Sequence, residues 1–203
     1  MSMRKTAAER QAEIILTALR LAHERGPERV SADAIAKLIG VSQPAVFRHF
    51  PTKQALWMAI AEWIGEALER IWQRAVSGDA PALLRLRELL RQHLMFIEAT
   101  PAIPAILFSR ELHSQNGALR AFFVSRVQRL GQLLGGLLQE AAREGAIPPR
   151  TDTAVAARML LSLVPGVMLR WSLQGREFDL VAEGMALLEL ALQGLAPTEA
   201  AGR

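Results

Sequence analysis

The chain has 203 residues, of which 51% are hydrophobic and 22% charged, a balance that is typical of a globular protein and excludes a disordered one. The absence of cysteine excludes disulfides and thiolate zinc sites and favours a reducing compartment. The net charge of +4 falls entirely in residues 1–53, which hold nine Lys or Arg against five Asp or Glu, so a polyanionic partner would be attracted to this quarter of the chain.

The apolar pattern along the chain is that of helices. Apolar residues recur at spacings of three and four almost throughout, and the alternation typical of strands is nearly absent. We therefore expect an all-α fold. The expected helices span residues 8–25, 32–39, 42–49, 53–75, 81–98, 118–144, 153–174 and 179–193. A short irregular helical stretch between Pro104 and His113 completes the series.

No segment of the sequence predicts export or membrane insertion. The first residues, MSMRKTAAERQ, are polar and charged, unlike the apolar core of a signal peptide. No stretch of 18 residues is free of charge, so we expect no membrane span. These features together favour a cytoplasmic location.

Two prolines in the stretch VSQPAVFRHFPTK mark helix boundaries. If Ser42 is the N-cap of a helix, Pro44 falls in its first turn, where backbone N–H groups have no intrahelical partner. Pro51 then ends that helix, and Thr52 caps the next one. Two short helices joined by a tight glycine turn and packed against a longer helix form a helix-turn-helix, with residues 42–49 as the recognition helix.

The side chains of this stretch suit the chemistry of DNA. Gln43 can offer its amide to adenine, and Ala45 is small enough to approach a thymine methyl group. Arg48, His49 and Lys53 can reach phosphates or guanine edges. Hydroxyl groups and N–H groups at helix N-termini suit phosphate oxygens. The predicted DNA-binding residues are Ser31, Ser42, Gln43, Pro44, Ala45, Phe47, Arg48, His49, Thr52 and Lys53.

These residues also carry a resemblance to a known family. SADAIA from Ser31, GVS from Gly40 and FRHFPTK from Phe47 resemble the DNA-binding domain of TetR-family repressors, over residues 8–58. The resemblance implies an all-α homodimer whose N-terminal helix-turn-helix domain binds a palindromic DNA operator. It also implies a larger C-terminal helical domain that binds a small-molecule inducer and pairs the subunits. The lysine that contacts a phosphate in the family corresponds to Lys53.

On this basis we expect a DNA-binding domain over residues 1–53 and an effector-binding and dimerisation domain over residues 54–203. One position departs from the family, which commonly has tyrosine where this chain has Phe47. That tyrosine hydroxyl usually contacts a phosphate, so the contact is lost here or is made by Arg48 or His49. We expect Phe50 to face the helical core, whereas Phe47 can face either the core or DNA.

The C-terminal region predicts architecture more readily than chemistry. By resemblance to the family, the last two helices form a four-helix bundle with the partner subunit. The apolar residues assigned to this interface are Leu160, Leu163, Val167, Leu180, Met185, Leu188 and Leu192. The residues assigned to an effector pocket are Trp63, Leu89, His93, Phe96, Phe108, Phe122, Met159 and Met168, although each also suits an ordinary core. Because only His93 and Arg91 are placed to offer polarity there, we expect an apolar or aromatic effector.

The sequence favours a ligand-responsive transcriptional repressor over two other classes. A DNA-bound scaffold for nucleoid organisation or cell division, acting without an inducer, would use the same helix-turn-helix. An enzyme is disfavoured, because the chain has no glycine-rich phosphate loop, no nucleophile elbow and no cysteine. Glu111 and His113 are two residues apart on a helix and point in different directions, a poor pair for a metal. We therefore expect no catalytic residue, no metal and no cofactor.

Overall fold

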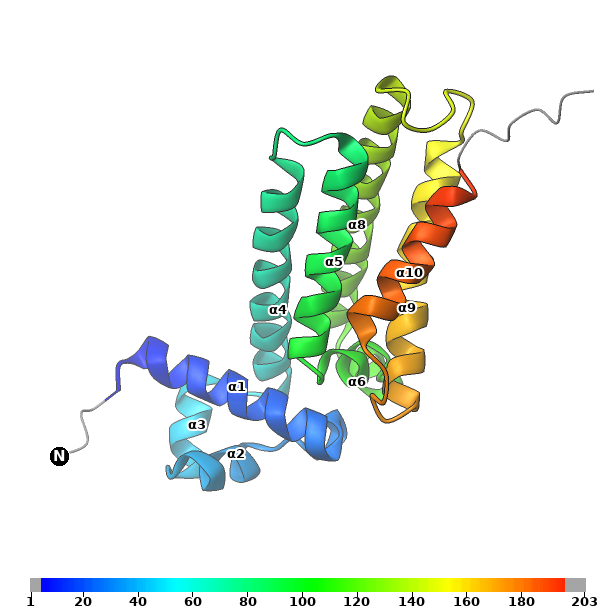
Figure 1. Cartoon of the computed structure of the whole chain (residues 1–203). Helices are drawn as coiled ribbons and strands as arrows, with labels where there is room; N and C mark the ends of the chain where they lie inside the picture. Colours follow the sequence, from blue (N-terminus) through cyan, green and yellow to red (C-terminus); the bar gives the residue numbers. More distant parts are fainter. Residues whose placement is uncertain (1–4, 196–203) are drawn as a thin grey trace, which may run out of the picture. The chain divides into compact units, whose positions relative to one another are not determined.

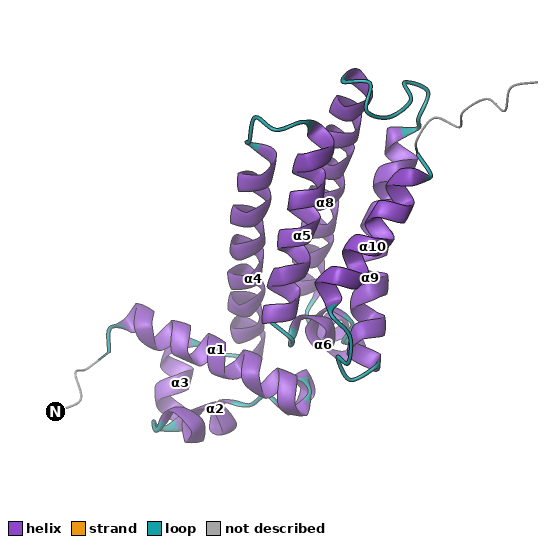
Figure 2. Ribbon diagram, viewed as in Figure 1, coloured by secondary structure: helices purple, strands orange, loops and turns teal. Residues whose placement is uncertain are grey.

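The structure is a computed structural model that describes residues 5–195, and every regular element in this range is helical (Figures 1 and 2). The elements are α1 (Ala7–Arg25), the 3-10 helix η1 (Pro27–Arg29), α2 (Ala32–Ile39), α3 (Gln43–His49), α4 (Lys53–Val76), α5 (Ala82–Ala99), α6 (Ile103–Leu107), α7 (Arg110–Gln115), α8 (Gly117–Arg143), α9 (Thr153–Leu173) and α10 (Leu180–Gln193). The all-α prediction is confirmed. The boundaries of the eight longer predicted helices agree to within a single residue.

The chain divides into two compact units. The first, called the N-terminal unit, contains the described residues up to Glu66 together with Thr100–Val124. The second, called the C-terminal unit, contains Ala67–Ala99 and the described residues from Ser125 onward. Helices α4 and α8 each contribute residues to both units.

The N-terminal unit is built on α1, which packs against α2 and α3. A capping box starts this helix: the Glu9 N–H donates to Thr6 Oγ1 at 3.2 Å, and the Thr6 N–H donates to Glu9 Oε2 at 2.7 Å. One face of α1 is apolar, and its residues Ile14, Ala18 and Leu21 are fully buried. Burial of this face fixes α1 as the support for the two short helices.

The turn between α2 and α3 depends on Gly40. Its φ of 67° and ψ of 39° lie in the left-handed region, where a side chain is unfavourable. The Val41 N–H reaches back to the Ala36 carbonyl oxygen at 3.0 Å, which satisfies one of the last carbonyls of α2. The glycine therefore ends α2 and lets α3 leave at the sharp angle that a helix-turn-helix needs.

In the C-terminal unit, α10 packs closely along α5. The Leu180 N–H donates to Glu98 Oε1 at 3.0 Å at one end of the contact. At the other end, Arg87 Nε and Nη2 donate to the two carboxylate oxygens of Glu189 at 2.6 and 2.9 Å. Gly184 lies between them, and a Cβ atom there would come within 2.5 Å of Leu94 Cδ1. The absence of a side chain at this position is therefore what allows the two helices to approach.

By length and composition alone, helix α9 is long and apolar enough to cross a membrane. Of its most apolar stretch of 18 residues, 33% is buried. Core helices of soluble proteins can be as long and as apolar. Asp152 is the N-cap of the helix, and its Oδ1 accepts from the N–H groups of Ala154 and Val155 at 3.0 Å. It continues through Pro165 without a break to Leu173.

Candidate nucleic-acid interface

A hollow of about 290 Å³ lies in the N-terminal unit where α2, α3 and the start of α4 meet. Its lining residues are Glu28, Val30, Ser31, Ala32, Gln43, Val46, Phe47, Phe50, Thr52, Lys53 and Leu56. Five predicted DNA-binding residues are thus brought together here: Ser31, Gln43, Phe47, Thr52 and Lys53. The other five, namely Ser42, Pro44, Ala45, Arg48 and His49, lie on α3 or at its start and do not line the hollow.

Two helices begin at this hollow. Ser31 caps α2 by accepting a hydrogen bond from the Ala34 N–H at 3.1 Å. Thr52 caps α4 in the same way, accepting from the Ala55 N–H at 3.0 Å. The start of a helix carries partial positive charge and N–H groups without an intrahelical partner, so both ends favour an anion. Lys53 adds a full positive charge beside them.

Helix α3, the predicted recognition helix, is anchored by apolar residues on one side only. Val46 is 1% exposed and Phe50 is 8% exposed, which confirms that Phe50 faces the core. Gln43 and Arg48 are exposed, whereas His49 is half-buried. The helix therefore presents its polar side chains outward, as a helix that enters the major groove of DNA must do.

Phe47 is 43% exposed and lines the same hollow as Lys53. Its ring stands at the position where the TetR family commonly has a tyrosine, and it has no hydroxyl to donate. It can contribute only apolar contact at this place. Any hydrogen bond to a phosphate here must come from neighbouring groups such as Thr52, Lys53 and the backbone N–H groups of α4.

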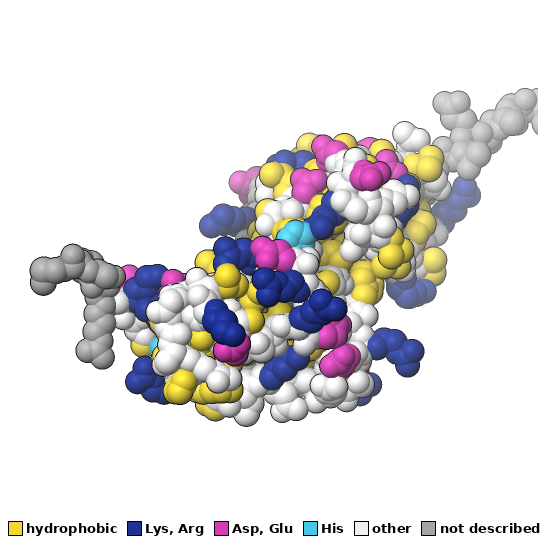
Figure 3. All heavy atoms as spheres, turned by 90° about the horizontal axis from the view of Figure 1, so that it is seen from below, with side chains coloured by type: hydrophobic (Ala, Val, Ile, Leu, Met, Phe, Trp, Pro, Cys, Tyr) yellow, Lys and Arg dark blue, Asp and Glu magenta, His cyan; other side chains and the backbone are white. Residues whose placement is uncertain are grey.

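The charges of the N-terminal unit are mixed rather than uniformly basic. In the view from below, Lys and Arg side chains are spread over the face turned to the reader, with acidic side chains among them (Figure 3). Lys37 pairs with Asp33 at 2.8 Å, which reduces its availability to a partner. Within the described part of the chain, neither Arg48 nor Lys53 pairs with a carboxylate. Neither side chain therefore has a carboxylate partner that would compete with a phosphate.

The predicted effector residues are distributed over both units. Leu89, His93, Phe96, Met159 and Met168 belong to the C-terminal unit, and Trp63, Phe108 and Phe122 belong to the N-terminal unit. Leu89, His93 and Met168 are buried, whereas Phe108 and Met159 are 41% and 42% exposed.

His93 accepts a hydrogen bond from a residue that was not among the predicted site residues. Trp72 Nε1 donates to His93 Nδ1 at 3.0 Å, and the two rings are stacked with centroids 5.7 Å apart. Burial lowers the pKa of His93 to about 4, so the imidazole is neutral at physiological pH. Because Nδ1 accepts this hydrogen bond, the ring proton is on Nε2. Two residues 21 positions apart on different helices give no local signal of such a pair.

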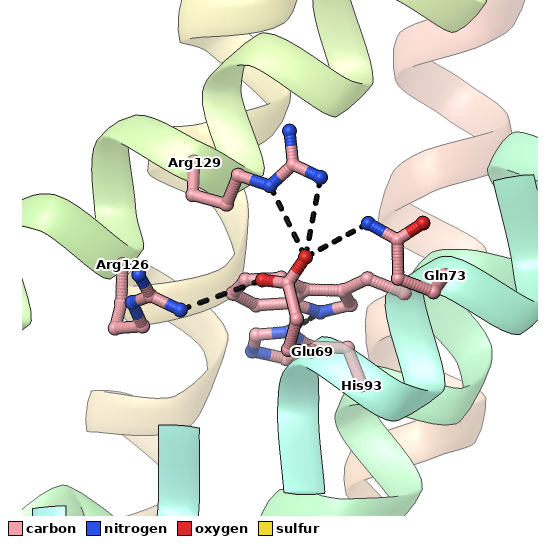
Figure 4. Close-up of polar contacts among 6 residues, drawn as sticks. Glu69, Gln73, His93, Arg126 and Arg129 are labelled. Atoms are coloured by element: carbon pink, nitrogen blue, oxygen red, sulfur yellow. Dashed lines mark hydrogen bonds and ion pairs between the residues drawn. The ribbon is translucent and has the colours of Figure 1, made fainter. Parts of the chain in front are cut away.

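A polar cluster on α4 and α8 was also not predicted from the sequence (Figure 4). Glu69 Oε1 accepts from Gln73 Nε2 at 2.8 Å and from Arg129 Nε and Nη2, both at 3.2 Å. Glu69 Oε2 accepts from Arg126 Nη1 at 3.4 Å. Burial opposes ionisation of Glu69, but the hydrogen bond from Gln73 and the two guanidinium groups outweigh it and lower its pKa. The cluster fastens α4 to α8 within the C-terminal unit.

The residues assigned to the dimer interface lie mostly inside the subunit. Five of the seven are buried in the chain's own core: Leu160, Val167, Leu180, Leu188 and Leu192. They are therefore not available at the surface of a single subunit, whereas Leu163 and Met185 are half-buried. The apolar side chains that α9 does expose are others, namely Val155 (49%), Met159 (42%), Leu169 (40%) and Leu173 (78%).

Two family profiles match the chain. The profile of bacterial regulatory proteins of the tetR family matches residues 14–60. The profile of the tetracyclin repressor-like C-terminal domain matches residues 79–194. The first match covers the helix-turn-helix and the hollow, and the second covers most of the remaining helices.

The similarity to individual proteins agrees with these two profile matches. The chain is 33% identical over 172 residues to the nucleoid occlusion factor SlmA of Vibrio atlanticus, a match that covers 83% of this chain and 87% of that protein. A TetR transcription regulator from Haloarcula marismortui superposes with a TM-score of 0.80 at 20% identity, covering 94% of this chain and all of that one. FadR from Bacillus subtilis, solved with stearoyl-CoA, gives a TM-score of 0.75 at 24% identity, with 90% and 98% coverage. At these identities the two structures establish the fold alone.

Proposed function

We propose that this chain, which belongs to the TetR family of DNA-binding regulators, is a homodimeric repressor that a small, largely apolar effector releases from a palindromic operator. Proteins of this family are not enzymes; they bind DNA operators and small-molecule effectors. The repressor role, the dimer and the nature of the effector are the parts proposed for this chain.

The observation that carries the proposal is the hollow beside α3. Two helix N-termini, the Lys53 ammonium group and the side chain of Gln43 meet there. Groups of the first two kinds bind phosphates and fix the position of a protein on DNA, whereas base edges are read by amides such as that of Gln43. A single surface thus holds the parts needed for affinity and for sequence recognition.

This assignment is tested by two substitutions with different signatures. Lys53→Ala should weaken binding to all duplexes similarly and lower the slope of log K against log salt by about one. Gln43→Ala should cost about 1–3 kcal/mol on the preferred duplex and relax the preference at one position of each half-site. An unchanged salt slope for the first variant would contradict a phosphate contact, and equal losses on preferred and random DNA would reassign the second residue to the backbone.

We place the subunit contact on the exposed face of α9. Val155, Met159, Ser162, Gly166, Leu169 and Leu173 are all exposed and follow one another at alternating spacings of four and three. A seam with this period packs against a second helix at a small crossing angle, as in four-helix bundles. Leu190 of α10, which is 66% exposed, extends the same kind of surface. A monomer in sedimentation at micromolar concentration would exclude this arrangement.

In the proposed mechanism the effector changes the separation of the two recognition helices. Half-sites one helical turn apart require a separation of about 34–36 Å, so a small change in that separation prevents simultaneous binding. DNA must then weaken effector binding by the same factor as the effector weakens DNA binding. The residues assigned to the effector pocket are mostly apolar, which favours an effector that carries little charge.

A second function is favoured by one specific observation. The 33% identity with SlmA of Vibrio atlanticus extends over 83% of this chain, and that protein is a nucleoid occlusion factor. A DNA-bound factor of this kind, acting without an inducer, is the alternative for this chain.

One experiment separates the two functions. DNA selected from a random pool gives the preferred sequence, whose distribution along the source chromosome is then mapped. A few sites beside promoters, with a metabolite that releases the selected duplex, would support the repressor. Many sites spread over the chromosome, with no metabolite that releases them, would support the nucleoid factor.

A further inference from the structure

One carboxylate lies at the edge of the proposed DNA interface. Glu28 in η1 lines the same hollow as Ser31, Thr52 and Lys53. Its main-chain carbonyl oxygen accepts a hydrogen bond from Lys53 Nζ at 3.1 Å. The residue that positions the lysine therefore also carries a negative charge, in a place where DNA phosphates are expected.

The Glu28 carboxylate is held by a residue from a distant part of the same unit. Ser109 Oγ donates to Glu28 Oε1 at 3.3 Å. Ser109 is the N-cap of α7, where it accepts from the Leu112 N–H at 3.2 Å, and it is 7% exposed. Glu28 and Ser109 both belong to the N-terminal unit, in which α7 contacts η1.

Gly26 makes room for this arrangement. Its φ of 87° lies in the left-handed region, and a Cβ atom there would come within 2.8 Å of Glu28 Oε2. The carboxylate thus lies against a residue without a side chain on one side and against the Ser109 hydroxyl on the other. None of the ion pairs among the described residues includes Glu28.

We propose that Glu28 is an internal competitor of the DNA backbone for Lys53, and that the Ser109 hydroxyl holds it aside. Because the carbonyl of Glu28 already contacts Lys53 Nζ, rotation of the Glu28 side chain brings its carboxylate within reach of the ammonium group. A lysine paired in this way no longer neutralises a phosphate, so one DNA contact is lost. The α6–α7 segment, through Ser109, then controls a DNA contact made at the start of α4. This inference rests on the proposed DNA interface and adds to it a means of regulation.

The test uses an isosteric pair of substitutions at Ser109. Aspartate and asparagine are both good N-caps, so both variants retain the cap of α7. Ser109→Asp repels the Glu28 carboxylate, whereas Ser109→Asn can still donate to it. For the duplex selected from a random pool, we expect Ser109→Asp to bind roughly five- to tenfold more weakly, with the salt slope lowered by about 0.9, and Ser109→Asn to bind within twofold of the native protein.

Glu28→Gln completes a double-substitution cycle. Glutamine can still accept from Ser109 and keeps the main-chain carbonyl for Lys53, but it cannot compete as an anion. Glu28→Gln in the Ser109→Asp background should restore affinity to within about twofold and restore the salt slope. Glu28→Gln alone should bind DNA as tightly as the native protein or up to about threefold more tightly, which tests the competition without changing α7.

Two results would overturn the inference. The first is additivity in the cycle, which would mean that the charge introduced by Ser109→Asp acts on DNA directly. The second is weaker binding by Glu28→Gln alone. Failure of the native protein to bind any selected duplex is a different result, since it would contradict the proposed function itself.

Discussion

The residues that line the hollow beside α3 in the N-terminal unit come from positions 28–56, whereas two polar contacts of the C-terminal unit join α4 to α5 and α4 to α8. In the first case the chemistry is carried by helix ends and by one short helix, which local sequence specifies directly. In the second case Trp72 meets His93, and Glu69 meets Arg126 and Arg129, because separate helices pack side by side. The residues predicted to contact DNA therefore come from one short stretch, whereas the contacts inside the C-terminal unit join distant parts of the chain.

The largest expected effect tests how firmly the recognition helix is anchored. Phe50→Ala should lower the free energy of unfolding by about 3–5 kcal/mol, because the ring is 8% exposed and packs in the core. Urea denaturation followed by circular dichroism measures the loss. Phe47→Ala is the matched control: at 43% exposure it should cost well under half as much. Similar losses for both variants would mean that the exposed face of α3 contributes as much to stability as the buried face.

The next effect concerns the close approach of α5 and α10 in the C-terminal unit. Gly184→Ala should destabilise the protein by about 1–3 kcal/mol, because the new Cβ would lie 2.5 Å from the buried Leu94 Cδ1. Gly136→Ala is the control, since a Cβ there meets nothing within 4 Å and alanine favours a helix. Denaturant titration of both variants measures the difference. Equal stability of the two variants would contradict the tight contact.

A third effect is a pH dependence of the free energy of unfolding that arises in the C-terminal unit. The pKa of His93 is lowered from 6.5 to about 4 by burial, so between these values the unfolded chain binds a proton that the folded chain does not. Stability should therefore fall as pH falls through this window, by about 2 kcal/mol between pH 7 and pH 5. Glu and Asp groups contribute mainly at lower pH.

His93→Gln provides the comparison for this pH dependence. The glutamine side chain can still accept from Trp72 Nε1 but does not titrate. Urea denaturation at pH 7 and pH 5 should show a smaller loss in the variant by about the same 2 kcal/mol. Parallel losses in both proteins would show that another group is responsible.

The smallest expected effect returns to the DNA interface. Phe47→Tyr adds the hydroxyl that the TetR family commonly has at this place, beside Lys53 in the hollow. A new hydrogen bond to a phosphate should tighten binding of every duplex by about 1 kcal/mol or less. Fluorescence anisotropy with the selected duplex and with a random duplex measures it. Tighter binding of the selected duplex alone would instead place residue 47 at a base edge.

Helix positions could be predicted from the sequence, because caps, turn glycines and apolar periods are local signals. Five of the residues predicted to contact DNA also meet at one hollow. Ser31, Gly40 and Thr52 each mark a helix boundary, and the structure confirms all three. The partners of His93 and Glu69 could not be predicted, since they depend on which faces of α4, α5 and α8 meet. The interface residues assigned to α9 show the same limit: an apolar period predicts that a face is covered, but it does not say whether the same chain or a second copy covers it.

The exposed apolar face of α9 has a consequence for how such a protein would work at low copy number. If that face is buried only by a second subunit, each dissociated chain exposes Met159, Leu169 and Leu173 to water. Such a chain is prone to aggregation and to proteolysis. The amount of DNA-binding species then rises more steeply than the amount of protein made. Occupancy of an operator would respond to synthesis as a threshold rather than in proportion, before any effector is present.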